Sequence, residues 1–441
     1  MSPNEILAIL CIVSFFCMLA IGIPVALTLA VSGLVFGYLG FGATLFNLLP
    51  ARIFGVTANY TLIAIPLFVF MGVMLEKSKI ADDLMDVIGH LAGSVSGGMG
   101  VGIVLVGVLM GATTGIVGAT IVTLGLITLP ALMRRNYHLP TACGTICASG
   151  TLGQIIPPST ILILLSDILG QSVGTLFAAA LIPGLLLSGI FCLYLLALGR
   201  LRPDLVPPVS LAERDLMSRA ELTRKALRVG LPPVALVLAV LGSIIGGVAA
   251  PTEAASMGAL GSILVVAIAG RFSFRVLREA TMATTRITAG MMFILICAQV
   301  FALTFRGLNG EQLVHDMFKW IPGGINAEIW FMMLIIFILG FFIEWIEISY
   351  IVVPLFLPIL QAADVNLVWI AIMVAVNLQT SFLTPPFGWA LFYLRSVAPP
   401  EVPTGAIYKG VLPFIGMQFL ALVLCFMYPD VALWLPRAIG W

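Results

Sequence analysis

Charge is scarce in this chain. Of its 441 residues only 9% are Asp, Glu, Lys or Arg, against about a quarter in a typical soluble domain. The 21 basic and 20 acidic residues nearly cancel to a net charge of +1, so the chain lacks the basic face of a nucleic-acid-binding protein. The hydrophobic share of 61% is more apolar surface than a soluble core can bury. A soluble enzyme and a disordered chain are therefore excluded, and a lipid bilayer is the solvent that suits this composition.

Residues for catalysis and cofactor binding are also scarce. The three histidines, His90, His138 and His315, are far apart in sequence, and no pair of them lies inside one apolar run to hold haem or a metal. The P-loop lysine motif of ATP-hydrolysing proteins is missing. The seven cysteines lie in apolar stretches without a Cys-x-x-Cys pair, as small hydrophobic filler does. We therefore expect neither an enzyme nor a bound cofactor.

Long apolar runs are abundant instead. A membrane-spanning helix needs about 20 mostly apolar residues. Runs of this kind are 5–21, 24–40, 58–76, 97–133, 140–170, 174–199, 229–249, 252–269, 281–305, 329–362, 366–396 and 411–435. The first run lacks the basic segment and the cleavage site of a signal peptide, so it is predicted to be a membrane span. The sequence thus predicts an all-α polytopic membrane protein.

Four of these runs are unusual. Runs 97–133 and 329–362 are too long for one crossing and contain no polar break, so we predict that each is a re-entrant hairpin that enters and leaves on the same side. Runs 140–170 and 366–396 carry Pro-Pro in the middle. We predict a broken helix in each, because proline removes a backbone donor and clashes with the preceding turn. About ten full spans then remain, five on each side of the charged loop 200–228.

Basic residues are distributed unevenly between the predicted loops. If loop 200–228 is cytoplasmic, 17 Lys and Arg residues, Arg286 among them, fall on that side and 4 fall outside. The positive-inside rule predicts such a bias, and this orientation places both termini outside the cytoplasm. Residues 80–94 combine an apolar face with an acidic one, which predicts an amphipathic helix on the inner membrane surface.

Prolines recur at a nearly constant offset. Pro24 and Pro251 are 227 residues apart. Three further pairs are 228 apart: Pro130 with Pro358, Pro157 with Pro385, and Pro158 with Pro386. Prolines are common in membrane helices in general, but each of these pairs falls on the same topological feature. Because five crossings per half is an odd number, the second half is inverted, as in secondary transporters. We predict a first repeat at 1–199, a cytoplasmic linker at 200–228 and a second repeat at 229–441.

The two Pro-Pro breaks are where we predict that ions and substrate bind. Every backbone donor and acceptor in hydrocarbon needs a partner, so the breaks around 150–159 and 380–388 must be buried in protein or line a polar cavity. Freed carbonyls and the Ser, Thr and Gln oxygens there are ligands that suit Na⁺. The half-helix N-terminus after each break presents free N–H groups to a carboxylate.

The hairpin tips are predicted to meet these breaks. The first tip is 111–120, and a shift of 228 residues gives 339–348, which contains Glu344 and Glu347. A carboxylate inside the membrane is costly unless it is paired, hydrated or protonated, which favours a cation ligand or a helix cap at Glu344. The alternative is a position at the outer membrane–water interface. For Glu347 both interpretations remain possible. For the first tip the alternative is a Gly/Thr helix-packing face.

Two other acids are interpreted as structural. Glu253 follows Pro251 at a helix start, where a proline and an acid are ordinary helix-start residues. Asp167 lies near the end of a predicted helix facing outside and is expected to be solvated.

The chain also resembles a known family. The segments that carry the likeness are Gly97-Gly98, GATTGIVGAT at 111–120, GTLGQIIPPS at 150–159, IPLF at 65–68, PTEAA at 251–255 and NLQTSFLTPPFG at 377–388. They span nearly the whole chain and are similar to the large membrane subunit of tripartite ATP-independent periplasmic (TRAP) transporters. Many family members carry Asp where this chain has Glu344, and a Ser-rich first tip where it has Thr113 and Thr114.

The resemblance implies an elevator-type transporter in the bacterial cytoplasmic (inner) membrane. In such a protein the two hairpins and two broken helices form a transport domain that a scaffold carries. It further implies Na⁺-coupled uptake of organic acids in a lipid environment. The implied partners are a periplasmic substrate-binding protein and a small membrane subunit of about four helices, which is expected to be a separate chain. Both termini of this chain would then be periplasmic.

Site hypotheses follow for two cations and one acid. The first Na⁺ is expected between the first tip and the first break, at Thr113, Thr114, Gly115, Gly118, Gly150, Gly153 and Pro157. The second Na⁺ is expected between the second tip and the second break, at Glu344, Thr380, Ser381 and Pro385. The substrate carboxylate is expected between them, at Gly115, Ser159, Thr160, Ser349, Thr384 and Gly388.

Two rival functions are considered. One is a stand-alone Na⁺- or H⁺-coupled carboxylate transporter of the same superfamily, which needs no binding protein. The other is a membrane subunit of a respiratory-type complex, which requires an optical cofactor or a chain of titratable residues through the spans. The sequence predicts neither of these features, so the second rival is less favoured. The identity of the organic acid is not encoded in any motif, because a separate binding protein sets most of the selectivity.

Overall fold

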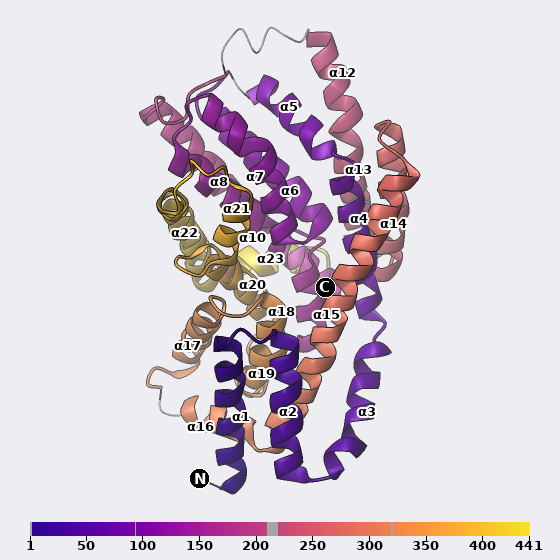
Figure 1. The fold of residues 1–441 in the computed structure, drawn as a ribbon, viewed down its shortest axis with the longest axis vertical. Helices are drawn as coiled ribbons and strands as arrows, with labels where there is room; N and C mark the ends of the chain where they lie inside the picture. The colour runs from indigo at the N-terminus through magenta and orange to yellow at the C-terminus, as the bar shows by residue number, and fades with distance from the viewer. Residues whose placement is uncertain (1, 93, 210–218, 319–320) are drawn as a thin grey trace.

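The structure is a computed structural model that describes residues 2–92, 94–209, 219–318 and 321–441. In these ranges every regular element is a helix, which confirms the predicted all-α class (Figure 1). The first half contains α1 (Pro3–Ala20), α2 (Val25–Phe41), α3 (Thr44–Thr57), η1 (Thr61–Ile63), α4 (Ala64–Lys77), α5 (Ile80–Ala92), α6 (Gly98–Thr114), α7 (Val117–Arg134), α8 (Leu139–Thr151), η2 (Leu152–Gln154), α9 (Thr160–Leu169) and α10 (Val173–Leu201). The second half contains α12 (Arg219–Val229), α13 (Leu231–Ile245), α14 (Pro251–Ile268), α15 (Phe274–Gly307), α16 (Gly310–Phe318), α17 (Gly324–Leu339), α18 (Trp345–Glu347), η3 (Ile348–Val352), α19 (Val353–Ala362), α20 (Leu367–Leu383), α21 (Trp389–Val397), α22 (Thr404–Met427) and α23 (Asp430–Ala438).

Helix starts follow local sequence signals. Ser2 and Glu5 form a capping box at α1, in which each side chain accepts a hydrogen bond from the other residue's backbone N–H. At α14 the Glu253 carboxylate accepts from the Ala250 N–H at 2.9 Å. The interpretation of Glu253 as a helix-start residue is therefore confirmed.

The helices agree with the predicted spans in number only approximately. Eight described helices are long and apolar enough to cross a membrane, or nine if the bent pair Thr44–Thr57 and Thr61–Lys77 counts as one span. Val117–Arg134 and Trp345–Ala362, which belong to the predicted hairpins, are among the eight. The chain is thus an integral membrane protein, whereas the count of ten full spans stays a prediction. Helix α3 was not predicted, because Asn47, Pro50 and Arg52 interrupt its apolar pattern.

Both long runs turn back on themselves. In the first, Arg135 Nη1 donates to Met99 Sδ at 3.6 Å, so residues 36 positions apart meet at one end of the α6–α7 hairpin. In the second, Phe331 and Ile335 of α17 line the same apolar cavity as Leu355 and Phe356 of α19. The two arms of the second hairpin therefore face each other across a gap. The turns themselves lie at 115–116 and 340–344, inside both predicted tips.

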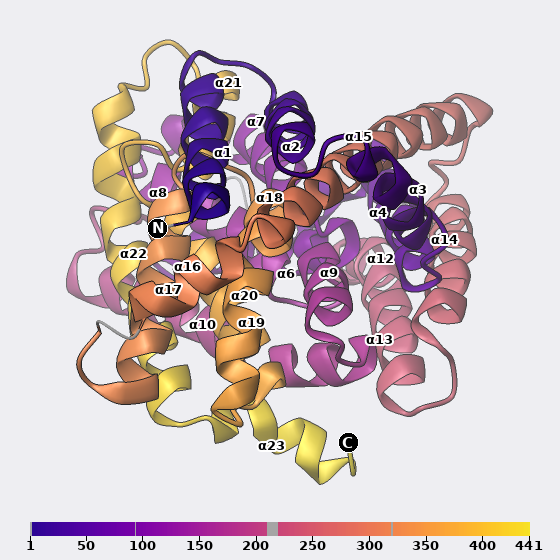
Figure 2. The same cartoon turned by 90° about the horizontal axis from the view of Figure 1, so that it is seen from below.

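The helices pack as two groups. A flanking group contains α1 to α4 and α13 to α15, and the long α15 contacts both α2 and α4. Thr304 Oγ1 of α15 donates to the Gly33 carbonyl of α2 at 2.7 Å. A central group contains the hairpins and the broken helices α8–α9 and α20–α21 together with α10 and α22. Figures 1 and 2 show α15 crossing the molecule diagonally beside this central group.

Charged contacts gather at one end of the molecule. Lys225 of α12 lies 3.2 Å from Asp86 and 3.8 Å from Asp83 of α5, and Arg271 lies 2.8 Å from Asp83. The predicted amphipathic helix 80–94 is thus present as α5, although residue 93 lies outside the described residues. These contacts bring three segments together, α5, α12 and the loop before α15, which the charge distribution assigned to one side of the membrane. The end of the predicted linker, 219–228, is helical.

The closest packing in the central group joins α8 and α22. A Cβ on Gly410 would overlap the Pro140 carbonyl oxygen and lie 2.9 Å from the Gly144 nitrogen, whereas a Cβ on Gly416 of the same helix meets nothing within 4 Å. We expect Gly410→Ala to destabilise the protein by about 1–3 kcal/mol, the usual cost of overpacking, and Gly416→Ala to leave it unchanged or slightly more stable. Melting temperatures of the detergent-purified variants check this. Equal melting temperatures would contradict the packing.

Candidate functional site

The first hairpin tip lies against the first helix break. Gly115 ends α6 with a left-handed φ of +59°, a conformation that glycine adopts at little cost. Its carbonyl accepts from Thr160 Oγ1 at 3.2 Å, and a Cβ on Gly115 would lie 3.3 Å from the Thr160 nitrogen. One helical turn earlier, a Cβ on Gly111 would lie 2.7 Å from the Gly153 nitrogen. Backbone groups of the tip and of the start of α9 therefore approach closely, as the repeat predicts.

The hydroxyls of the first half are bonded locally. Thr113 Oγ1 donates to the Met110 carbonyl at 2.9 Å, and Thr114 Oγ1 lies 3.1 Å from Thr120 Oγ1. Ser159 Oγ donates to the Gln154 carbonyl at 2.5 Å. A hydroxyl that donates in this way still has lone pairs to offer a cation.

Three other predicted ligands face apolar or aromatic side chains or lie in a turn. Gly150 faces Ile121 and Gly118 faces Tyr393, where an added Cβ would meet those side chains. Pro157 is buried within the turn between the two half-helices. In contrast, both amide atoms of Gln154 are buried and have no hydrogen-bond partner in the described part of the chain. Gln154 therefore supplies a Gln oxygen of the kind expected at the first break, although the ligand set for the first Na⁺ did not name this residue.

The second tip repeats this arrangement. A Cβ on Gly340 would lie 2.8 Å from the Ser381 Cβ. Shifting that pair back by 228 residues gives Ala112 and Gly153, next to the close pair Gly111 and Gly153 of the first half. Across the same junction, the ring centroids of Phe342 and Phe387 are 5.7 Å apart. The tip-to-break contact is thus common to both halves.

The hydroxyls of the second half are also bonded locally. Each of four predicted residues donates to a carbonyl of its own segment: Thr380 to Val376 at 2.9 Å, Ser381 to Leu378 at 2.9 Å, Thr384 to Thr380 at 2.7 Å, and Ser349 to Trp345 at 2.7 Å. Gly388 N–H donates to the Thr384 carbonyl at 3.0 Å, which closes the turn that holds Pro385. Ser349 is fully buried and lines neither of the two cavities at the second tip.

The two halves meet through a pair of residues related by the repeat itself. Gln379 Nε2 donates to Thr151 Oγ1 at 3.2 Å, and these residues are 228 positions apart. Gln418 Nε2 of α22 donates to the same oxygen at 3.2 Å. One buried hydroxyl therefore joins three helices, α8, α20 and α22, and two of the residues involved are related by the predicted repeat offset.

Removing the Thr151 hydroxyl is expected to destabilise the folded protein. Thr151→Val leaves two buried amide donors without their acceptor, at about 1–3 kcal/mol each. Thr128→Val is the matched control, because the buried Thr128 hydroxyl bonds only to the Leu124 carbonyl of its own helix. We expect Thr151→Val to lower the melting temperature clearly more than Thr128→Val. Equal decreases in melting temperature would show that the two hydrogen bonds to Thr151 contribute little to the stability of the protein.

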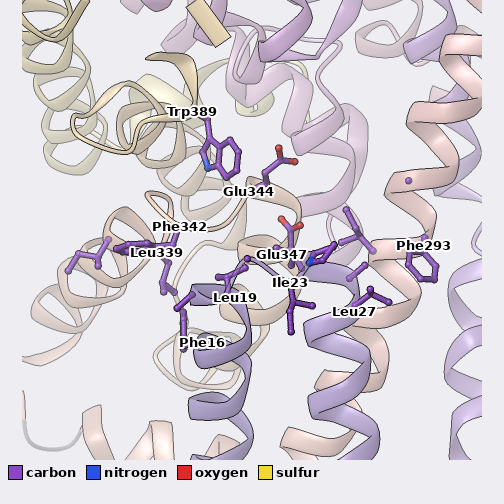
Figure 3. A pocket seen from close by; sticks show the side chains of 18 residues that line it. Phe16, Leu19, Ile23, Leu27, Phe293, Leu339, Phe342, Glu344, Glu347 and Trp389 are labelled. Carbon is purple, nitrogen blue, oxygen red and sulfur yellow. The ribbon is translucent and has the colours of Figure 1, made fainter. Parts of the chain in front are cut away.

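The two glutamates of the second tip border cavities. Glu344 lines a cavity of about 1110 Å³ together with Glu347 and Trp389, and Figure 3 shows the Glu344 carboxylate beside the Trp389 indole and the Glu347 carboxylate farther from it. Glu344 also lines a second cavity of about 280 Å³ with Gly115 and Tyr393, and Tyr393 OH donates to Glu344 Oε1 at 3.3 Å. Glu347 is 2% exposed, and its Oε2 has no hydrogen-bond partner among the described residues. Both carboxylates thus border a cavity at the second tip, and Glu344 also borders the cavity that reaches Gly115 of the first tip.

Asp167 is not simply solvated, and this corrects the expectation from sequence. It is half-buried and accepts from Asn59 Nδ2 at 2.6 Å and from Tyr350 OH at 3.0 Å. Asn59 belongs to the flanking group and Tyr350 to the second hairpin, so this carboxylate connects the two groups of helices. The partners lie 108 and 183 residues away along the chain, and no local pattern signals them.

Comparison with known proteins agrees with this architecture. The family model described as "Tripartite ATP-independent periplasmic transporter, DctM component" matches residues 12–431. A relative from Pseudomonas aeruginosa, the C4-dicarboxylate TRAP transporter large permease protein DctM, is 31% identical over 402 residues, which cover 89% of this chain and 90% of that protein. The ectoine TRAP transporter large permease protein TeaC of Halomonas elongata is 28% identical over 435 residues, covering 95% and 96%.

Two further comparisons extend this. The sialic acid TRAP transporter large permease protein SiaM of Vibrio cholerae is 26% identical over 417 residues, covering 94% and 95%. Among solved structures, the YdaH transporter of Alcanivorax borkumensis matches with a TM-score of 0.61 at 17% identity and covers 94% of this chain and 97% of that chain. At this identity the likeness is one of fold.

Proposed function

We infer the function from one premise: this chain belongs to the tripartite ATP-independent periplasmic transporter family, as its DctM component, the large permease subunit. Its relatives are transporter permeases and not enzymes, so the chain is a transport protein of the membrane. We propose that it carries out Na⁺-coupled secondary uptake of an organic acid by an elevator mechanism. The observation that carries the proposal is that each hairpin tip contacts the helix break of its own half.

Na⁺ coupling is supported by the atoms at the two junctions. The first junction offers Gly115 and Thr160 backbone groups, hydroxyl lone pairs and the unpartnered Gln154 oxygen. The second offers Glu344 and the unpartnered Glu347 Oε2. Oxygen ligands of this kind suit a hard monovalent cation, and broken helices near mid-membrane are where secondary transporters hold their coupling ions. A bound cation also offsets the cost of keeping two carboxylates out of water.

An elevator motion is supported by the division into two groups of helices. The central group holds both junctions, and the flanking group presents the long α15 alongside it. Substrate and ions cover polar groups that hydrocarbon would otherwise contact, so a loaded central group crosses at lower cost. Asp167 bridges the groups in this conformation, and its bond to Asn59 would have to break when the central group moves.

The substrate class and partners follow from the relatives. Their substrates are named as C4-dicarboxylates, sialic acid and ectoine, all of which carry a carboxylate. We propose that this chain receives an organic acid from a periplasmic binding protein and works beside a small membrane subunit of about four helices. The proposed location is the inner membrane with both termini in the periplasm, which is consistent with the charged contacts of α5 and α12 at one end.

Uptake into proteoliposomes tests the function. The chain is reconstituted with the proposed binding protein and small subunit, and uptake of radiolabelled succinate, ectoine or sialic acid is followed with and without an inward Na⁺ gradient. We expect accumulation only with the gradient and only with all partners present. Uptake by the purified chain alone would instead indicate a stand-alone carboxylate transporter. Uptake that is independent of Na⁺ but requires a proton gradient would show that H⁺, and not Na⁺, is the coupling ion.

A further inference from the structure

The cavity of about 280 Å³ contains a charged residue that the sequence had assigned elsewhere. It is bordered by Gly115 of the first tip, Glu344 of the second tip, Tyr393 of α21 and Arg286 of α15. Among the described residues that line it, Arg286 is the only Lys or Arg. The charge distribution counted Arg286 on the cytoplasmic side, at the start of the predicted run 281–305. In the structure it lies 12 residues inside α15, about 18 Å along the helix axis at 1.5 Å per residue.

Arg286 differs from two of the other three arginines of α15, which form ion pairs. Arg275 lies 2.9 Å from Glu279, and Arg306 lies 2.9 Å from Glu311. In the described part of the chain Arg286 has no ion-pair or hydrogen-bond partner. A cation within an apolar run is costly unless it pairs with an anion or faces water. Arg286 is exposed, so its guanidinium calls for either water or an anion, and the cavity that it lines is where an anion can reach it.

We propose that Arg286 binds the carboxylate of the transported acid, so that the flanking group completes the substrate site formed by the two tips. Arginine suits this role because its planar fork donates two parallel hydrogen bonds to a carboxylate. This inference rests on the proposed transport of an organic acid, and it identifies a residue outside the hairpins and breaks as the main acid-binding group. Because α15 is in the flanking group, the contact would hold the acid in the present arrangement and release it when the central group moves.

Substitution of Arg286 tests this directly. Arg286→Gln is expected to raise the concentration of acid needed for half-maximal stabilisation by about ten- to a hundredfold, the range for loss of a charge-assisted pair. Arg286→Lys, which keeps the charge without the fork, should fall between. Arg278→Gln is the matched control, because Arg278 lies eight residues earlier on α15, is exposed and lines neither cavity at the second tip. The readout is the melting temperature of the purified protein titrated with succinate, ectoine and sialic acid at fixed Na⁺.

A second readout separates acid binding from a structural role. For the acid that stabilises the wild-type protein best, the titration is repeated with its uncharged amide. We expect the wild type to prefer the acid strongly and Arg286→Gln to lose that preference. A variant that keeps both the wild-type acid affinity and the preference for acid over amide would overturn the proposal. Acid affinity is measured here without any gradient, so a failure of Na⁺ coupling in proteoliposomes is a separate result.

Discussion

Glu344→Ala is expected to abolish Na⁺-driven uptake while leaving the protein folded. Glu344 lines both cavities at the second tip and is bonded there only to Tyr393 OH in the described part of the chain. An interaction with a charged group is worth about 1.5–3 kcal/mol, so its loss lowers the affinity for a bound cation by about ten- to a hundredfold. The measurement is the initial uptake rate as a function of Na⁺ concentration in proteoliposomes.

Two further variants give this prediction its control. Glu328→Ala removes a carboxylate from α17, the first arm of the same hairpin, where it lines neither cavity at the tip, and it should transport normally. Glu344→Asp keeps the charge and should retain partial activity with a raised Na⁺ requirement. If Glu344→Ala transports with an unchanged Na⁺ dependence, then this carboxylate does not hold the coupling ion.

Gly340→Val is expected to block transport through geometry alone. An added side chain at Gly340 meets the Ser381 side chain, which belongs to the break in the second half. Because no charge or ligand atom is removed, any loss comes from pushing the tip away from the break. Displacement by about 1 Å in a positioned site can cost about a hundredfold in rate, and we expect an effect of that order on uptake.

Gly189→Val on α10 is the matched control for that variant, since a Cβ there meets nothing within 4 Å. Both variants are first compared by size-exclusion chromatography and melting temperature. Uptake by Gly340→Val at the control rate would show that contact between tip and break is dispensable for transport.

The sequence predicted those parts of the fold that depend on local backbone chemistry. The pairs Pro157-Pro158 and Pro385-Pro386 mark both breaks, because two consecutive prolines remove two backbone donors and clash with the preceding turn. Single prolines such as Pro130 and Pro183 are accommodated inside helices. The helices accordingly stop before 155–159 and 384–388. The constant offset between these prolines predicted the equivalent tips, and both turns lie inside the predicted ranges. Family motifs added the class of protein, which the comparisons confirm.

The sequence did not predict contacts that depend on where helices cross. The offset relates Thr151 to Gln379, but it does not predict their hydrogen bond, which depends on how closely α8 and α20 pack. Arg286 was counted with the cytoplasmic charges, although it lies within the predicted span 281–305. A basic residue inside a predicted span was the available signal. The location of the ion and acid ligands stays a prediction.

The dependence of the initial uptake rate on Na⁺ concentration tests the central claim most directly. If each of the two tip-to-break junctions binds one Na⁺ and both must be filled before the loaded central group moves, the wild-type rate rises sigmoidally with Na⁺ concentration. A rate that is indifferent to Na⁺, at a saturating concentration of the loaded binding protein, would contradict the account.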